Sequence, residues 1–145
     1  MRYFYLLAAL LICSSTQAQL YYDASDALPD NGARGQSMDV KAVDLNGDES
    51  LDIVLANEFQ PNTILWNNGS GQFSLAASPA LAVQNHDSED VVVADFNGDE
   101  ALDLAFCSED DVTLGIQNVH ELYFGDGAGN FTTSTYNFPD TEANA

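Results

Sequence analysis

A nine-residue pattern rich in oxygen-bearing side chains occurs twice in this 145-residue chain, 51 positions apart. The first copy covers residues 44–52 and reads DLNGDESLD, and the second covers residues 95–103 and reads DFNGDEALD. Positions 1, 3, 5 and 9 of each copy are Asp or Asn, and position 7 offers its backbone carbonyl. Hard cations such as Ca2+ bind about six to eight oxygens at about 2.3–2.6 Å. The spacing therefore predicts one calcium loop in each copy, that is, two Ca2+ sites.

Each predicted site uses four side chains and one main-chain oxygen. We expect Asp52 to bind in a bidentate manner, and Leu51 and Leu102 to point into the core and anchor the loops. Mg2+ is less suited, because it prefers a tighter octahedron and keeps its waters. A pair of ordinary turns without metal is the alternative, since Asp, Asn and Gly are favoured in any turn. The predicted ligands are Asp44, Asn46, Asp48, the carbonyl of Ser50 and Asp52 in the first loop, and Asp95, Asn97, Asp99, the carbonyl of Ala101 and Asp103 in the second.

Two other calcium-binding folds use a similar spacing, and neither suits this chain. An EF-hand requires an acidic residue at position 12 of its loop, where Leu55 and Phe106 stand here. A dockerin continues its loop into a helix, whereas residues 51–56 have the composition of a strand.

The segments around the loops have the pattern of short strands, and no window has a helical stripe of apolar residues. Glycine-rich stretches at residues 67–71 and 125–129 predict hairpin turns. Four antiparallel strands repeated at a period near 51 residues are typical of a propeller blade. The predicted strands cover residues 51–56, 63–66 and 73–77 in the first repeat, and residues 90–94, 102–106, 119–124 and 131–136 in the second.

On these residues the chain resembles the FG-GAP or VCBS family of repeats. The family pattern is a strand, a D-x-N/D-G-D-G-x-x-D loop, a second strand, and a G-x-G hairpin followed by phenylalanine; both copies match it over most of residues 36–136. The resemblance implies an all-β fold with two four-stranded antiparallel blades of a β-propeller, at about residues 36–80 and 87–139. The family has glycine at loop position 6, where Glu49 and Glu100 stand here. We therefore expect a strained or more weakly binding loop.

The resemblance also implies that further blades exist outside this chain, since the family's rings have roughly seven. Residues 21–28 predict a stray outer strand. Two isolated blades would expose apolar flanks and unpaired strand edges. We expect a fragment of a longer protein, or a truncated gene, whose remaining blades complete the ring. The alternative is a short chain that completes its ring by forming oligomers.

The N-terminus has the pattern of a secretory signal peptide. An apolar run at residues 3–12 is too short to span a bilayer, and small residues at Thr16 and Ala18 suit a cleavage site. We expect a signal peptide at residues 1–18, a repeat region at residues 19–145 and no membrane span. The expected location is secreted, periplasmic or on the cell surface.

Charge and cysteine content narrow the choice of partners. The chain has 23 acidic and 3 basic residues and a net charge of −20. Such a surface repels nucleic acid and anionic membranes and favours cations. Cys107 is the one cysteine that remains once the expected signal peptide, which contains Cys13, has been cleaved. Its apolar sequence neighbours predict that it is a small core residue.

Catalytic motifs are absent from the sequence: there is no nucleophile elbow, phosphate loop, zinc pair or dinucleotide fingerprint. We expect His86 to be a solvated loop residue, and Trp66, Tyr123 and Phe124 to pack in the core rather than line a ligand surface. The sequence predicts no enzyme but a secreted calcium-binding module for adhesion, in which structural Ca2+ supports binding of a protein or polysaccharide. Alternatives are the non-catalytic portion of a secreted polysaccharide-degrading enzyme's propeller, or a truncated product.

Overall fold

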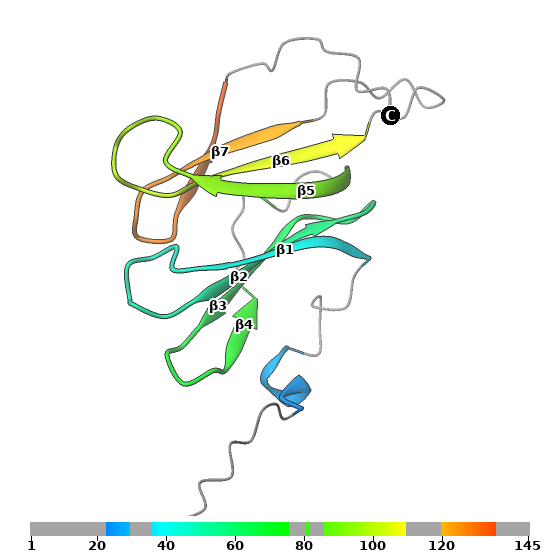
Figure 1. Ribbon diagram of the computed structural model, residues 1–145, viewed down its shortest axis with the longest axis vertical. Coiled ribbons are helices and arrows are strands. Elements are labelled where there is room, and N and C mark those ends of the chain that lie inside the picture. The colour runs from blue at the N-terminus through cyan, green and yellow to red at the C-terminus, as the bar shows by residue number, and fades with distance from the viewer. Residues whose placement is uncertain (1–22, 30–35, 76–80, 82–85, 110–119, 136–145) are drawn as a thin grey trace, which may run out of the picture.

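Two four-stranded antiparallel sheets, stacked on each other, form most of the chain that the computed structural model describes (Figure 1). The described residues are 23–29, 36–75, 81, 86–109 and 120–135. Each sheet is a meander in which successive strands pair in chain order. The first sheet contains β1 (Ser37–Val43), β2 (Asp52–Asn57), β3 (Thr63–Asn67) and β4 (Phe73–Leu75), and the second contains β5 (Asp87–Ala94), β6 (Asp103–Glu109), β7 (Glu121–Gly125) and β8 (Phe131–Thr133). The all-β prediction and the two four-stranded sheets are therefore confirmed.

The two sheets share their strand register in detail. Asp52 pairs with Val43 at the end of the first loop, and Asp103 pairs with Ala94 at the end of the second. The register of the first strand pair shifts at Met38 in one sheet and at Glu89 in the other, which are also 51 positions apart. An extra residue of this kind is a β-bulge, which bends the strand and increases its twist. The sequence repeat is thus a repeat of one complete sheet, including its irregularity.

The hydrophobic core lies between the sheets, because alternate residues of each strand point to the same face. The first sheet contributes Val54, Ala56 and Ile64 to a cluster that the second completes. The rings of Phe106 and Tyr123 meet edge to face with centroids 6.0 Å apart. Full burial of a side chain of this size stabilises the fold by roughly 1.5–3 kcal/mol. The second sheet's buried contribution is Val91, Leu104, Phe106, Tyr123 and Phe131.

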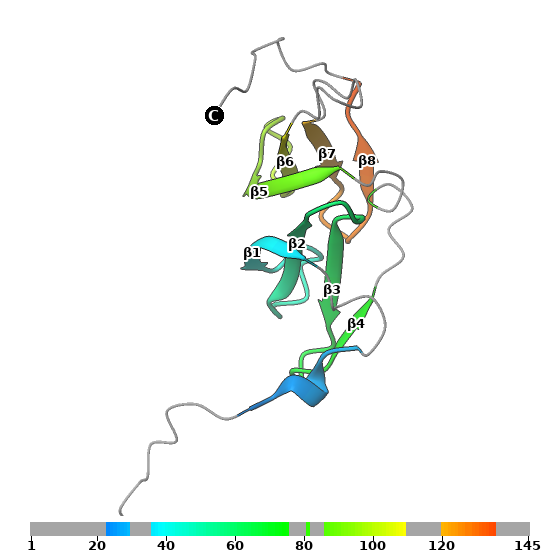
Figure 2. The same ribbon diagram turned by 90° about the vertical axis from the view of Figure 1, so that its right-hand side faces the viewer.

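The first strands of the two sheets, β1 and β5, lie side by side at one edge of the stack (Figures 1 and 2). The backbone N–H of Val91 on β5 donates to the carboxylate of Asp39 on β1 at 3.1 Å. Lys41 forms ion pairs with Asp39 and with Asp90, whose Oδ1 lies 3.5 Å from the lysine Nζ. The carboxylates at this edge are therefore held around a single ammonium group.

Polar side chains also cross the junction between the sheets. Asn62, which is buried, donates to Ser88 Oγ at 3.0 Å and to Glu121 Oε2 at 3.3 Å. Tyr123 donates to Glu121 Oε1 at 2.7 Å, and His86 Nδ1 lies 3.8 Å from Glu121 Oε2. Burial raises the pKa of Glu121, and the hydrogen bond from Tyr123 and the nearby His86 offset only part of that increase. This network joins Asn62 beside the first sheet to four residues on or beside the second.

Several local predictions are wrong. Residues 25–27 form a 3-10 helix, η1 (Ser25–Ala27), and not part of an outer strand over residues 21–28. Cys107 is exposed rather than in the core, because it lies on the face of β6 that points away from the first sheet. Leu51 is 57% exposed and does not anchor its loop, whereas Leu102 packs partly buried against the core. His86 is not a solvated loop residue, since its side chain is only 18% exposed.

The aromatic predictions are confirmed for Tyr123, which is buried, and for Trp66, which packs against the core. The prediction is wrong for Phe124, which follows Tyr123 in β7 and therefore lies on the opposite face of the sheet. The expected signal peptide at residues 1–18 lies outside the described residues. Within the described part of the chain, no helix is long and apolar enough to cross a membrane.

Candidate metal centres

The first loop is folded around the carboxylate of Asp44. Its Oδ1 accepts the N–H of Gly47 at 2.8 Å and the N–H of Asp48 at 3.2 Å, and its Oδ2 accepts the N–H of Glu49 at 2.9 Å. Partial desolvation opposes ionisation of Asp44, but these backbone donors outweigh it and lower the pKa of the carboxyl. The first position of the loop is therefore an ionised carboxylate at neutral pH.

The second loop has the same arrangement around Asp95. Its Oδ1 accepts from the N–H of Gly98 at 2.6 Å and of Asp99 at 3.2 Å, and its Oδ2 accepts from Glu100 at 2.9 Å. The hydrogen bond from Glu100, followed by that from Gly98, lowers the pKa of Asp95. The two loops therefore share one pattern of backbone hydrogen bonds around the aspartate at position 1.

The side chains at positions 3 and 5 meet at the loop surface. Asn46 Oδ1 accepts the N–H of Asp48 at 3.0 Å, and Asn46 Nδ2 donates to Asp48 Oδ2 at 3.1 Å. Asp48 Oδ1 in turn accepts the N–H of Ser50 at 2.8 Å. The second loop has equivalent bonds. Asn97 Oδ1 accepts the N–H of Asp99 at 2.9 Å, and Asn97 Nδ2 donates to Asp99 Oδ2 at 2.8 Å. Asp99 Oδ1 accepts the N–H of Ala101 at 2.9 Å. Ser50 and Ala101 join these networks through their amides, and a metal-binding role for their carbonyls stays a prediction.

The aspartate at position 9 lies beneath each loop and is completely buried. Asp52 accepts the N–H of Leu45 at 3.2 Å and, through its other oxygen, the N–H of Asn67 at 2.9 Å. Burial raises the pKa of Asp52, and the charges of Asp48 and Asp44 add to the increase. Asp103 makes the matching bonds to Phe96 at 2.8 Å and Gly125 at 2.9 Å. Each of these carboxylates joins its loop to the end of the third strand of its own sheet.

The turn at position 6 has the backbone strain expected from a residue other than glycine at this position. Glu49 has φ 68° and Glu100 has φ 71°, in the left-handed region that glycine adopts easily. The glycines at position 4, Gly47 and Gly98, have φ 76° and 82°. Glutamate at position 6 therefore adopts a conformation that favours glycine, and the loop backbone is strained there.

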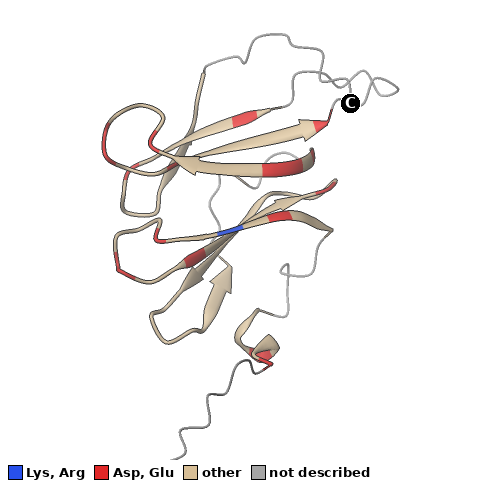
Figure 3. Cartoon of the chain, in the orientation of Figure 1, with Lys and Arg blue, Asp and Glu red and all other residues tan. Residues whose placement is uncertain are grey.

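Both loops contain several acidic residues, and they lie at the same side of the two stacked sheets (Figure 3). Lys41 is the one lysine or arginine in the described part of the chain, and it lies on β1, away from the loop tips. No lysine or arginine in the described residues therefore competes with a cation for the loop oxygens.

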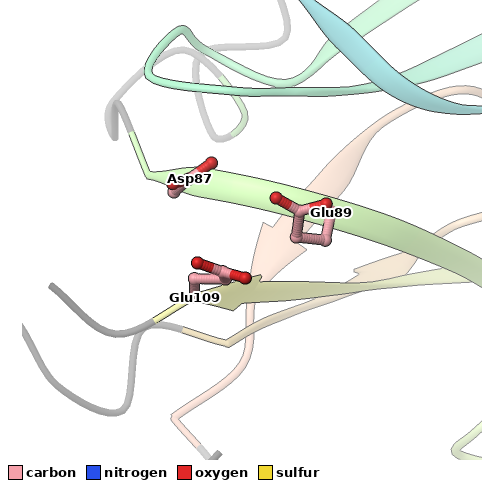
Figure 4. Close-up of side chains that lie close together, drawn as sticks. All are labelled: Asp87, Glu89 and Glu109. Carbon is pink, nitrogen blue, oxygen red and sulfur yellow. The ribbon is translucent and has the colours of Figure 1, made fainter. Parts of the chain in front are cut away.

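A second acidic group, which the sequence did not predict, lies at the far end of the second sheet. Asp87, Glu89 and Glu109 bring carboxylate oxygens within 4.8 Å of one another (Figure 4). Asp87 pairs with Glu109 across β5 and β6, and Glu89 is the extra residue of the β-bulge. Burial raises the pKa of Glu89, and Asp87, Glu109 and Glu58 add to the increase. Within the described residues, the three aspartates of each predicted loop do not come this close together.

The hairpin of the second repeat lies against the first loop. A Cβ on Gly129 would meet Trp66 at 3.0 Å and Asn46 at 3.3 Å, and a Cβ on Gly47 would meet the carbonyl of Gly127 at 3.4 Å. A shallow pocket of about 230 Å3 lies here, lined by Asn46, Trp66, Ala128 and Gly129. Sequence reasoning missed this contact, because it joins residues that are more than 60 positions apart.

Stacked antiparallel sheets, each with an Asp- and Gly-rich loop between its first two strands, define a β-rich repeat protein. Comparison with known families assigns the repeat: residues 44–106 match the model described as an FG-GAP-like repeat. That stretch contains both nine-residue loops, so the resemblance to FG-GAP repeats is confirmed there. No curated protein matches the chain.

Proposed function

We propose that this chain is an exported binding module in which each nine-residue loop holds one structural Ca2+. The observation that carries the proposal is the shared loop geometry. In both loops the aspartate at position 1 collects the backbone N–H groups, and the aspartate at position 9 is buried beneath them. The FG-GAP-like match supports this reading.

The residues of each loop fit a hard cation by their chemistry. Each loop offers three carboxylates and one amide oxygen, and a carboxylate has about four lone-pair sites. An oxygen of Asp44 or Asp52 that accepts one N–H can therefore still bind a cation. The side chains at positions 3 and 5 are the adaptable part, because Asp48 and Asp99 are exposed and can turn inward. The bound ion would supply positive charge between carboxylates that otherwise repel each other.

A structural role suits the position of the loops better than a catalytic one. Each loop connects the first two strands of a sheet, and its last aspartate reaches the third strand. A cation there would tie three strands together, and at one hundred times its dissociation constant it would stabilise the fold by about 2.7 kcal/mol. We therefore assign no catalytic activity to these residues.

The two sheets are best understood as neighbouring blades of a β-propeller. Their four-stranded meanders, their face-to-face packing and the FG-GAP-like match support this arrangement. The N-terminal apolar run supports export. The ligand that we propose is a protein or a polysaccharide, bound through the loops that project from the sheets.

Calcium titration of matched loop variants tests the proposal. The chain contains one tryptophan, Trp66, which lies beside Asn46 of the first loop at the Gly129 contact. Calorimetry should find two Ca2+ per chain in the wild type and one in each of Asp48→Asn and Asp99→Asn. The calcium-induced change in Trp66 fluorescence should disappear in Asp48→Asn and persist in Asp99→Asn. Wild-type protein that gives neither heat nor a fluorescence change with excess Ca2+ would refute the metal sites.

A further inference from the structure

The two sheets pack against each other through two different faces, one from each sheet. The equivalent of each packed face is also present on the other sheet. The first sheet uses the face that contains Val54, Ala56 and Ile64, and the second uses the face that contains Val91 and Phe106. Because the sheets repeat each other, each of these faces has a counterpart on the other sheet. Those counterparts point away from the interface, since successive strand residues alternate between faces.

The outer face of the second sheet corresponds to the inner face of the first. Val54, Ala56 and Ile64 have as counterparts Ala105, Cys107 and Leu122, with equivalent strand pairing: Val54 pairs with Ile64, and Ala105 pairs with Leu122. We call this the second face: Val92, Ala105, Cys107, Leu122 and Phe124. Val92 is 43% exposed and the Cys107 thiol is exposed, whereas Ala56, the counterpart of Cys107, is completely buried.

The outer face of the first sheet corresponds to the inner face of the second. Val40 pairs with Leu55 on this face, and their counterparts Val91 and Phe106 pair in the core. We call it the first face: Val40, Ala42, Ile53, Leu55 and Leu65. Leu65 is already buried at 2% exposure, so the open part of this face is on β1 and β2. Val40 is 56% exposed, whereas its counterpart Val91 is completely buried.

We propose that the second face of one copy of this chain packs against the first face of another copy, head to tail. The two faces are apolar counterparts of the two halves of an interface that already forms within the chain. A contact between unlike faces leaves one free face at each end of the assembly. It therefore propagates into a closed ring or an open row, depending on the rotation between copies.

The new contact brings Asp90 of one copy, which lies on the second face beside Cys107 and stands where Asp39 stands in the existing interface, toward Asp39 of the other copy. Each of these two carboxylates keeps an ion pair with Lys41 of its own copy. Val92 stands where Lys41 stands in the existing interface, so the new contact lacks that ammonium group. Asp39 of the copy that offers the first face nevertheless keeps its own ion pair with Lys41. The new contact thus has the apolar side chain of Val92 in place of the charged side chain of Lys41, and the ion pair between Asp39 and Lys41 stays intact within each copy.

Two single substitutions, one on each face, test the inference. The chain is expressed from its full-length coding sequence, and its mass is measured by native mass spectrometry and sedimentation over a range of concentrations in excess Ca2+. The wild type should assemble, and Val40→Glu and Val92→Glu should each weaken assembly by about a hundredfold or more, because an unpaired carboxylate would be buried. Ser70→Glu, in an exposed hairpin away from both faces, should assemble as the wild type does.

Mixing the two face variants provides the decisive result. Each variant keeps one intact face, so an equimolar mixture should form dimers of one copy of each and nothing larger. In the wild type, alkylation of Cys107 should slow as assembly proceeds. A wild type that stays monomeric, face variants that assemble normally, or a mixture that stays monomeric would each overturn the proposal. Circular dichroism of each variant establishes that it is folded before its mass is interpreted.

Discussion

Replacing Asp52 with asparagine should destabilise the protein even when no calcium is present. Both oxygens of this buried carboxylate accept backbone N–H groups, from Leu45 and from Asn67. Asparagine offers one oxygen and one NH2 group, so one of the two backbone donors would face another donor. The substitution therefore removes one hydrogen bond to a charged group and leaves a buried N–H without an acceptor.

The expected loss follows from those two contacts. A hydrogen bond to a charged group contributes about 1.5–3 kcal/mol. Burial raises the pKa of Asp52, so removal of the charge recovers a part of this loss. The free energy of unfolding should therefore fall by about 2 kcal/mol. Asp103→Asn should cause a similar loss, because Asp103 accepts from Phe96 and Gly125 in the same way.

Urea denaturation at neutral pH, monitored by circular dichroism in excess chelator and then in excess Ca2+, measures the effect. Asp48→Asn is the matched control, because Asp48 is exposed and belongs to the same loop. It should be close to wild type in chelator and lose stability only with Ca2+. If Asp52→Asn equals the wild type in chelator and differs only with Ca2+, Asp52 is a ligand and not an anchor, and the reasoning from its hydrogen bonds fails.

Three further outcomes are expected. Glu49→Gly should raise the free energy of unfolding by about 1 kcal/mol in urea denaturation. The reason is that the substitution relieves about 1–2 kcal/mol of strain at the positive φ of Glu49, which exceeds the cost of the added entropy of the unfolded chain. Glu49→Gln keeps the strain and should show no such gain. Lys41→Met should lower the melting temperature by a few degrees at neutral pH, since Asp39 and Asp90 lose their shared partner; an unchanged melting temperature would mean that this pair contributes nothing. Burial raises the folded-state pKa of Glu121 above its unfolded value, so the stability contributed by this carboxyl is full below about pH 4.3 and is lost as the pH rises through the folded pKa. The wild type should therefore lose stability relative to Glu121→Gln between about pH 4 and neutral pH, and a difference that is constant across that interval would contradict the assignment.

The sequence predicted those parts of the fold that depend on local patterns. The two loops, the strands after them and the hairpins at residues 67–71 and 125–129 follow from turn residues and from alternation within a few positions. The positive φ at Glu49 and Glu100 was also foreseeable, because a sharp turn at loop position 6 requires it whichever residue is there.

Features that depend on packing between the sheets were not predictable in this way. Cys107 lies in an apolar segment, but its exposure depends on which face of β6 meets the first sheet. His86 is largely buried beside Glu121, which is 35 positions further along the chain. The close approach of Asp87, Glu89 and Glu109 depends on the cross-strand register of β5 and β6, beside a bulge that local periodicity does not reveal.

The hairpin that rests on the first loop sets an order of events during synthesis. The first loop leaves the ribosome roughly 80 residues before Gly127 and Gly129, which pack against Gly47 and Trp66. The N-terminal repeat can therefore form its own strand pairs early, but the surroundings of its loop are completed only after the second repeat has folded. The part of the chain that is made first is thus among the last to reach its final structure.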